Sequence, residues 1–311
     1  MQKIQLIYIL GMGHSGSTLL DLILDRHPDI ESIGEIRFFK KFMENNINCS
    51  CQRKFKECPY WQEILDLYHQ KRKGDSSPCD LGGKRRLSTL DYIRNLKQPL
   101  DGRLYTREEI HMYGMRNYHL FKSILESQGK KIILDSSKDW QRLYLLYASG
   151  LFDIKIIYLY RDGRSNLESN KRKDKKLQIN WYYPGPVSQT IRFIKTHITI
   201  RRFLRNNIDA SRIYGLEYKA FTKNFGAEIN QLLEFLEIEP SPELFSSFSG
   251  EIHNIGGNGM RFQNIDFDNI RPRLKWKKNL TRWEKIVYML FGGGIINKEF
   301  NRHKYQNVEN N

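Results

Sequence analysis

The chain has 311 residues, of which 51 are Lys or Arg and 35 are Asp or Glu, so its formal net charge at pH 7 is +16. This length suits one large domain with a sizeable buried core, and the positive charge favours an anionic ligand or an acidic polymer as partner. The sequence contains no helix-turn-helix, RRM or zinc-finger pattern, so we expect no nucleic-acid partner.

Membrane insertion is not expected either. No apolar run reaches the length of a transmembrane helix, and the N-terminal residues do not form a signal peptide. Residues 4–10 are apolar, but a glycine-rich loop follows them at once. We therefore expect a cytoplasmic protein without a transmembrane segment.

The first predicted elements are a buried strand over residues 4–10 and a helix over residues 17–26. The loop between them is rich in Gly and Ser and opens directly into the helix. At such a junction, backbone N–H groups and the positive end of the helix dipole point at one anion. The stretch is therefore a candidate phosphate-binding loop.

This loop matches two known patterns incompletely. Gly11, Gly16 and Thr18 have the spacing of a P-loop, but Ser17 stands where the P-loop lysine neutralises the phosphates of a nucleoside triphosphate. Gly11, Gly13 and Gly16 also fit G-x-G-x-x-G of dinucleotide-binding proteins, with Glu31 or Glu35 as the acidic residue that follows. The loop alone leaves both alternatives open.

A short extended segment is predicted over residues 30–34, and residues 45–105 form an irregular, partly helical section that contains all four cysteines. These are Cys49, Cys51, Cys58 and Cys79. They are candidates for a metal site, for a disulfide or redox pair, or for reduced structural thiols. The C-x-C…C spacing lacks the paired C-x₂-C knuckles of common zinc sites, and a cytoplasmic protein disfavours a permanent disulfide.

The rest of the chain alternates between helices and apolar strands. Helices are predicted over residues 107–128, 140–148, 166–176, 187–206 and 226–236, and strands over residues 131–134, 155–160 and 212–217. This alternation predicts an α/β, P-loop-like three-layer fold in which helices flank a central parallel sheet. We expect one domain over residues 1–311, with an insertion over residues 40–125.

Polar and basic residues follow two of these strands. Asp135-Ser136-Ser137-Lys138 comes after the strand over residues 131–134, and Arg161-Asp162-Gly163-Arg164 comes after the strand over residues 155–160, with Ser169 further along. Ligands of parallel sheets bind at the carboxyl ends of strands. A guanidinium and a hydroxyl there would suit a second phosphate, unless Arg161 instead pairs with a neighbouring acid such as Asp162.

With these motifs in place, the chain resembles the sulfotransferases that use 3′-phosphoadenosine-5′-phosphosulfate (PAPS) as donor. Residues 13–20 resemble the family's 5′-phosphosulfate loop, and residues 161–169 resemble its 3′-phosphate motif R-D-[PG]-R-x₄-S. Residues 27–35 (HPDIESIGE), residues 214–236 and residues 253–262 resemble further family segments, the first being closest to the tyrosylprotein and carbohydrate branch.

The resemblance implies roles for individual residues. Glu35 is the candidate base, and Asp135 is a rival for that role. Lys138 is the candidate for stabilising the bridging oxygen. His14 replaces the usual Arg or Lys and is a candidate donor to the phosphosulfate or a candidate general acid. The implied PAPS-binding residues are Gly13, His14, Ser15, Gly16, Ser17, Thr18, Leu19, Arg161, Ser169 and Arg261.

The resemblance further implies sulfuryl transfer to a hydroxyl or amine, with PAPS as co-substrate, adenosine 3′,5′-bisphosphate (PAP) as product and no required metal. We expect the acceptor to be a carbohydrate, an acidic polymer or another biomolecule. Two alternatives are a P-loop-like nucleotide kinase or NTPase, and a non-catalytic anion-binding protein of the same fold. The binding of PAP without Mg²⁺ separates the first alternative from a sulfotransferase.

Overall fold

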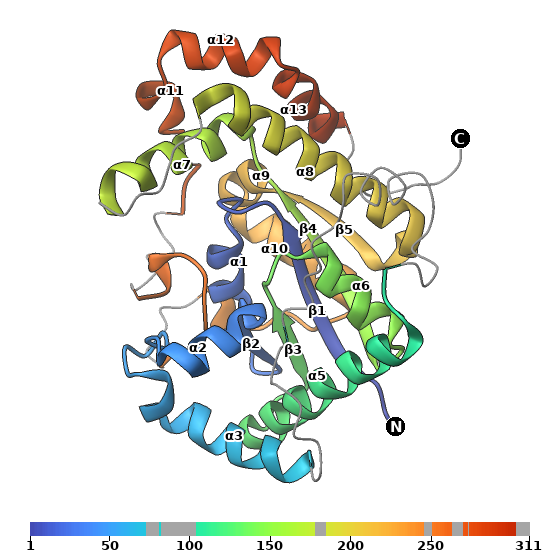
Figure 1. Cartoon of the computed structure of the whole chain (residues 1–311). Coiled ribbons are helices and arrows are strands. Elements are labelled where there is room, and N and C mark those ends of the chain that lie inside the picture. The colour runs from blue at the N-terminus through green and yellow to red at the C-terminus, as the bar shows by residue number, and fades with distance from the viewer. Residues whose placement is uncertain are drawn as a thin grey trace.

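The computed structural model describes residues 1–72, 81, 104–177, 185–245, 251–262, 270–272 and 274–302. Its centre is a sheet of five strands in the order β2-β3-β1-β4-β5, and every described pairing between them is parallel (Figure 1). The strands are β1 (Ile4–Gly11), β2 (Ile30–Gly34), β3 (Ile132–Asp135), β4 (Phe152–Tyr160) and β5 (Ile213–Glu217). The predicted α/β fold with a central parallel sheet is confirmed.

The register brings the carboxyl ends of the three central strands to one edge of the sheet. Tyr8 of β1 lies opposite Asp135 of β3, and Gly11 of β1 lies opposite Leu159 of β4. The strand order also reverses at β1, because β3 follows on one side and β4 on the other. Such a switch point is where parallel sheets bind ligands, so the loops after β1, β3 and β4 mark the place to look for a site.

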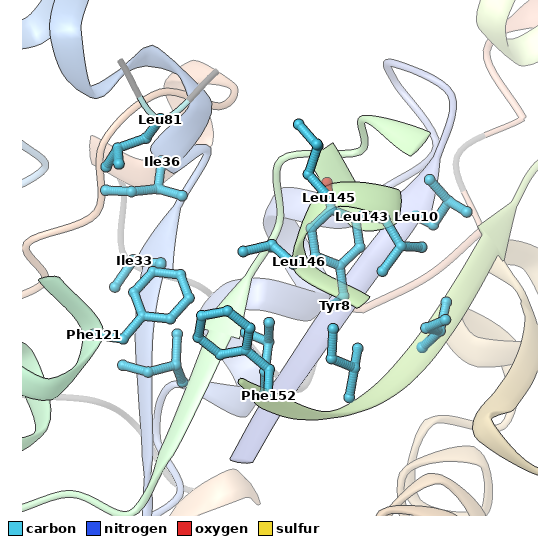
Figure 2. Close-up of a cluster of buried hydrophobic side chains, with 14 of the residues drawn as sticks. Tyr8, Leu10, Ile33, Ile36, Leu81, Phe121, Leu143, Leu145, Leu146 and Phe152 are labelled. Atoms are coloured by element: carbon cyan, nitrogen blue, oxygen red, sulfur yellow. The ribbon is translucent and has the colours of Figure 1, made fainter. Parts of the chain in front are cut away.

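Helices cover both faces of the sheet because its strands are apolar on both sides. One face packs on α1 (Ser17–Leu24), α9 (Tyr218–Lys223) and α10 (Phe225–Leu236). The other packs on α5 (Arg107–Gln128), α6 (Trp140–Ala148) and α8 (Gly185–Asn207). Figure 2 shows the second face, where Tyr8 and Leu10 of β1 meet Leu143, Leu145 and Leu146 of α6.

The remaining helices extend this core at two ends, as Figure 1 shows. They are α2 (Phe39–Asn45), α3 (Pro59–Lys71), α7 (Gly163–Leu177), α11 (Trp276–Asn279), α12 (Arg282–Leu290) and α13 (Gly293–Arg302). Short 3₁₀ turns are η1 (Ile36–Phe38), η2 (Phe55–Glu57), η3 (Ala210–Arg212), η4 (Pro242–Phe245) and η5 (Gly259–Phe262). In the described part of the chain, no helix combines the length and apolarity that crossing a membrane requires.

The predicted elements match the structure closely, with instructive exceptions. β4 begins at Phe152, three residues before the predicted strand, because the stretch Phe-Asp-Ile-Lys alternates buried and half-buried residues beside β1. The section predicted as irregular and partly helical contains α3, whose bounds were not predicted; it begins with Pro59 at its first position, where a missing N–H costs no hydrogen bond. The sequence predictions also missed α12, although Thr281 and Glu284 form a capping box at its start.

Candidate functional site

The loop after β1 and the first turn of α1 form the centre of the site. We call residues 12–18 the phosphate loop. The N-cap residue of α1 is Gly16, which has no side chain to accept from the first N–H groups of the helix. The first turn of α1 carries no acidic residue. These donors and the helix dipole therefore remain available for an external anion.

Two glycines of the phosphate loop differ in what surrounds them. At Gly16, φ is +103°, and an added Cβ would lie 2.2 Å from Cδ2 of Tyr218, so only glycine fits there. At Gly13, an added Cβ would meet no atom within 4 Å. Gly16 is thus required by the protein itself, whereas Gly13 leaves space beside the backbone into which a ligand fits.

Ser15 carries an unpaired polar atom in this loop. Its side chain is only 2% exposed, and its Oγ has no hydrogen-bond partner among the residues that the structure describes. An unsatisfied buried hydroxyl is costly. A phosphate or sulfate oxygen in the loop is the kind of partner that removes this cost.

Lys138 connects the phosphate loop to Glu35. Its Nζ donates to Oε1 of Glu35 at 2.6 Å, to Oγ of Ser17 at 3.0 Å and to the carbonyl oxygen of Ser136 at 3.3 Å. The side chains of Lys138 and Glu35 are 8% and 9% exposed. The structure therefore brings together three of the predicted site residues from the ends of three different segments.

The backbone of Lys138 adopts an unusual conformation that places this amine. Its φ is +61°, in the left-handed region, which costs a non-glycine residue about 1–2 kcal/mol. The Lys138 N–H donates to the carbonyl oxygen of Ile9 in β1 at 3.2 Å, which holds the turn against the central strand. Such strain, maintained by the surrounding structure, is frequent at functional sites.

Glu35 is held as a carboxylate. Burial acts to raise its pKa, but Lys138 and Arg37 outweigh burial and keep the pKa below its ordinary value. Arg37 contributes a second ion pair, from Nη2 to Oε2 of Glu35 at 2.9 Å. The group is thus ionised at neutral pH and able to accept a proton.

The rival acid, Asp135, is placed differently. It is fully buried and pairs with Arg142, also fully buried, at 2.8 Å. Its Oδ1 accepts the N–H of Ser137 at 2.9 Å, so this carboxylate shapes the turn that leads to Lys138. Asp135 supports the site from within the core, and Glu35 is the acid that contacts the predicted site residues.

The segment after β4 reaches the phosphate loop from the opposite side. Nη1 of Arg161 donates to the carbonyl oxygen of His14 at 3.2 Å, and its guanidinium stacks over the ring of Tyr218 at 4.2 Å. Asn166 of α7 donates to the carbonyl oxygen of Gly13. Arg161 is therefore placed at the loop, as the sequence predicts.

Asp162 and Ser169 belong to the same segment but have no contact with the phosphate loop among the interactions of the described residues. Asp162 accepts from Nη2 of Arg164 at 2.6 Å and from Asn297 at 3.0 Å, so it serves a different arginine from the one that reaches the loop. Ser169 lies on α7 and is 8% exposed. The role of Ser169 toward a second phosphate stays a prediction.

Residues 253–261, which we call the late loop, lie across the phosphate loop. Ile255 forms a parallel bridge with Gly34, and its carbonyl oxygen accepts the N–H of Glu35 at 2.7 Å. The N–H of Asn258 donates to Oγ1 of Thr18 at 3.2 Å. The late loop therefore holds both the acid and the phosphate loop.

Arg261 ends the late loop and binds backbone rather than the phosphate loop. Its Nη1 donates to the carbonyl oxygen of Asn254 at 3.2 Å, and its Nη2 donates to that of Asn48 at 3.1 Å. Its predicted contact with nucleotide phosphates stays a prediction. Leu19, also predicted as a ligand residue, has its side chain in the core and can contribute only its backbone.

Sequence reasoning missed Asn166, Tyr218, Asp21 and Asn254. Asp21 is buried in α1, and Nδ2 of Asn254 donates to its Oδ2 at 2.6 Å; burial raises the pKa of Asp21 to about 7. An acid within an apolar helix run was the available signal for Asp21.

Among the predicted metal candidates, Cys49, Cys51 and Cys58 lie together near His253, whereas Cys79 lies outside the described residues.

No protein-family model and no curated protein matches this chain. Among solved structures, the chain resembles the sulfotransferase domain from the curacin biosynthetic pathway, with a TM-score of 0.57 and 18% identity over 95% of this chain and 99% of that one. It also resembles the sulfotransferase domain from the Synechococcus PCC 7002 olefin synthase, with a TM-score of 0.51 and 16% identity over 96% of each chain. The chain thus has the fold of sulfotransferase domains.

Proposed function

We propose that this protein is a sulfotransferase that transfers a sulfuryl group from PAPS to a hydroxyl or amine. The observation that carries the proposal is the contact of Lys138 Nζ with both Ser17 Oγ and Glu35 Oε1, at 3.0 and 2.6 Å. It joins a cation, a phosphate loop and an ionised acid at the carboxyl edge of the sheet. These are the groups that in-line transfer from a phosphosulfate requires.

The phosphate loop suits the 5′-phosphosulfate of PAPS. Its unpaired Ser15 Oγ, the open space at Gly13 and the uncapped N-terminus of α1 are matched by the oxygens of one anionic group. Arg161 stands beside the loop, where a guanidinium serves the separate 3′-phosphate, with Ser169 as a further donor. The product of the reaction is PAP.

The nucleoside-triphosphate alternative fits the same residues less well. In a P-loop, the lysine contacts the β- and γ-phosphates, and the following hydroxyl binds Mg²⁺. Here Ser17 replaces that lysine, and Oγ1 of Thr18 accepts the N–H of Asn258 at 3.2 Å. Both departures are compatible with a phosphosulfate.

The ion pair between Glu35 and Lys138 suggests how proton removal and leaving-group stabilisation are coupled. Glu35 takes the proton of the acceptor as the acceptor atom bonds to sulfur and the sulfur–oxygen bond to the 5′-phosphate breaks. Protonation neutralises Glu35, which loosens its hold on Nζ of Lys138. The ammonium is then free to donate to the phosphate oxygen on which negative charge develops.

The acceptor class is proposed from the charge of the chain and from one sequence similarity. The formal net charge of +16 attracts anionic molecules, and residues 27–35 are similar to the corresponding stretch of tyrosylprotein and carbohydrate sulfotransferases. We therefore propose a carbohydrate or an acidic polymer as the first acceptors to examine. We also propose that the protein acts in the cytoplasm.

Two measurements test this function. PAP should raise the melting temperature of the protein in the presence of EDTA, and ³⁵S-labelled PAPS should label at least one member of a panel of carbohydrates, tyrosyl peptides, lipids and phenols. Stabilisation by Mg·ATP but not by PAP would instead indicate a kinase or NTPase. Binding of PAP without transfer to any acceptor, unchanged in Lys138→Met, would indicate an anion-binding protein.

A further inference from the structure

Four side chains outside the candidate site converge on one point. Sγ of Cys49, Sγ of Cys51, Sγ of Cys58 and a ring nitrogen of His253 all lie within 4.8 Å of one another. Three come from a short stretch before α3, and the fourth comes from the late loop. Cys49 and Cys58 are fully buried, and the side chain of His253 is 17% exposed.

Three of the separations between these atoms are close to the edges of one coordination tetrahedron, and all of them lie within 4.8 Å. Nδ1 of His253 lies 3.3 Å from Sγ of Cys58 and 3.8 Å from Sγ of Cys49, and the Sγ atoms of Cys51 and Cys58 are 3.7 Å apart. With Zn–S at about 2.3 Å and Zn–N at about 2.0–2.1 Å, a tetrahedral zinc ion has S–S edges of about 3.8 Å and S–N edges of about 3.6 Å. One ion therefore fits at the centre.

Two neighbouring groups flank His253. Its Nε2, the nitrogen turned away from the thiols, lies 3.8 Å from a carboxylate oxygen of Glu251, which places a negative charge near the imidazole without a direct hydrogen bond. The ring of Tyr60 stacks on that of His253 at 4.6 Å and 6°. Cys58 is the N-cap residue of α3, so the helix fixes its position.

We propose that Cys49, Cys51, Cys58 and His253 bind one structural Zn²⁺ ion. Three thiolates and one imidazole form a closed tetrahedral set without an open position, which is typical of structural rather than catalytic zinc. Thiolates and imidazole also select zinc over Mg²⁺ or Ca²⁺, which prefer oxygen ligands. Binding displaces the three thiol protons, so the site carries one net negative charge.

The ion would fasten the late loop to the segment before α3. His253 directly precedes Asn254 and Ile255, which contact Asp21, Gly34 and Glu35. Ser50 lies between two of the cysteines, and its Oγ donates to the carbonyl oxygen of Asn254 at 2.8 Å. The metal thus stabilises the loop that covers the phosphate loop, without itself contacting the reacting groups.

The metal content of the purified full-length protein tests the site. After expression in zinc-supplemented medium and dialysis, mass spectrometry of the metals should find about one zinc ion per chain. Cys51→Ser and His253→Ala should lose it, whereas His69→Ala, which removes an exposed histidine of α3, should retain it.

A second measurement does not depend on any variant. Replacing zinc by Co²⁺ in the wild-type protein should produce the intense visible bands of a tetrahedral cobalt–thiolate site, and excess zinc should remove them. The proposal is overturned if the reduced protein contains no zinc and shows no such bands with Co²⁺. It is also overturned if His253→Ala retains the metal as well as the wild-type protein does, or if mass mapping finds Cys51 and Cys58 quantitatively joined in a disulfide.

Discussion

Nζ of Lys138 lies 2.6 Å from Oε1 of Glu35, and both side chains are more than nine-tenths buried. Two opposite charges this close in a low-dielectric environment attract each other strongly. The amine keeps the carboxylate ionised, and the carboxylate holds the amine at Ser17. The following predictions test what each member of this group and its neighbours does.

Lys138→Met should lower kcat by about 10²- to 10³-fold, because it removes a cation that contacts both Ser17 and Glu35. Binding of PAP should weaken much less, since the backbone of the phosphate loop is unchanged. Steady-state rates with labelled PAPS and calorimetry with PAP measure the two effects. The matched control is Lys41→Met, an exposed lysine of α2, which should leave both unchanged. Equal losses in kcat and PAP affinity would contradict a role at the leaving oxygen.

Glu35→Gln should lower kcat by about 10²- to 10⁴-fold at pH 7, because the amide cannot accept the acceptor's proton. Arg37 can still donate to the remaining oxygen, so the fold should persist. Since the pKa of Glu35 is held below its ordinary value, the wild-type rate should start to fall only below about pH 4.3. A rate–pH profile checks this. Glu44→Gln on α2 is the control, and an unchanged rate in Glu35→Gln would move the base role elsewhere.

Gly13→Ala and Gly16→Ala should fail in different ways. Gly16→Ala places a Cβ 2.2 Å from Tyr218 at φ +103°, so we expect a loss of about 1–3 kcal/mol in the free energy of unfolding. Gly13→Ala meets no protein atom and should unfold like the wild type but bind PAP more weakly, since the methyl group occupies ligand space. Denaturant unfolding and PAP titration separate the two. Unchanged PAP affinity in Gly13→Ala would place the ligand elsewhere.

Arg161→Gln should discriminate between two nucleotides. If Arg161 binds the 3′-phosphate, affinity for PAP should fall by about 10- to 100-fold, the value of one charge-assisted hydrogen bond. Affinity for adenosine 5′-phosphosulfate, which has no 3′-phosphate, should change little. Competition calorimetry with both nucleotides on one protein sample provides the internal control. An equal loss for both would show that Arg161 acts only through the carbonyl of His14.

His197→Gln should remove part of the acid sensitivity of the fold. His197 is 1% exposed, and burial, with Arg201 contributing, lowers its pKa to about 3. Between pH 6.5 and 4 the unfolded chain therefore binds a proton that the folded chain does not, so this histidine lowers stability by about 1.4 kcal/mol per pH unit as pH falls. The raised pKa of Asp21 acts in the opposite direction, but it does so in both proteins. Urea unfolding at several pH values should show the wild-type protein losing stability faster; parallel curves would contradict the assignment.

The sequence predicted the sheet well because its strands are short apolar runs. Such runs can be recognised without knowing which distant residues they contact. The positions of Lys138 and Arg161 could also be predicted, since residues after parallel strands gather at one edge of the sheet, whereas their roles stay predictions. The ion-pair partners of the acidic residues were harder to predict. Nothing local distinguishes Asp135, which is neutralised by Arg142 in the core, from Glu35, which contacts Lys138.

Distant contacts explain the rest of what the sequence did not reveal. The spacing of the cysteines lacks the paired knuckles of common zinc sites, and the fourth proposed ligand, His253, is 204 residues from Cys49 in the chain. Tyr218 follows β5, and only the packing of α9 against the phosphate loop shows why Gly16 must lack a side chain. Such information lies in the tertiary structure, not in any sequence window.

Asn254 and Asp21, which hold the late loop against α1, are 233 residues apart in the chain. During synthesis all five strands emerge before the segment that covers Thr18 and Glu35, so the sheet can assemble while its ligand-binding edge is still open. A nascent chain, or one truncated before residue 253, lacks this cover. On the proposed function, stabilisation by a nucleotide therefore distinguishes chains that extend past the late loop from shorter fragments that contain only the sheet.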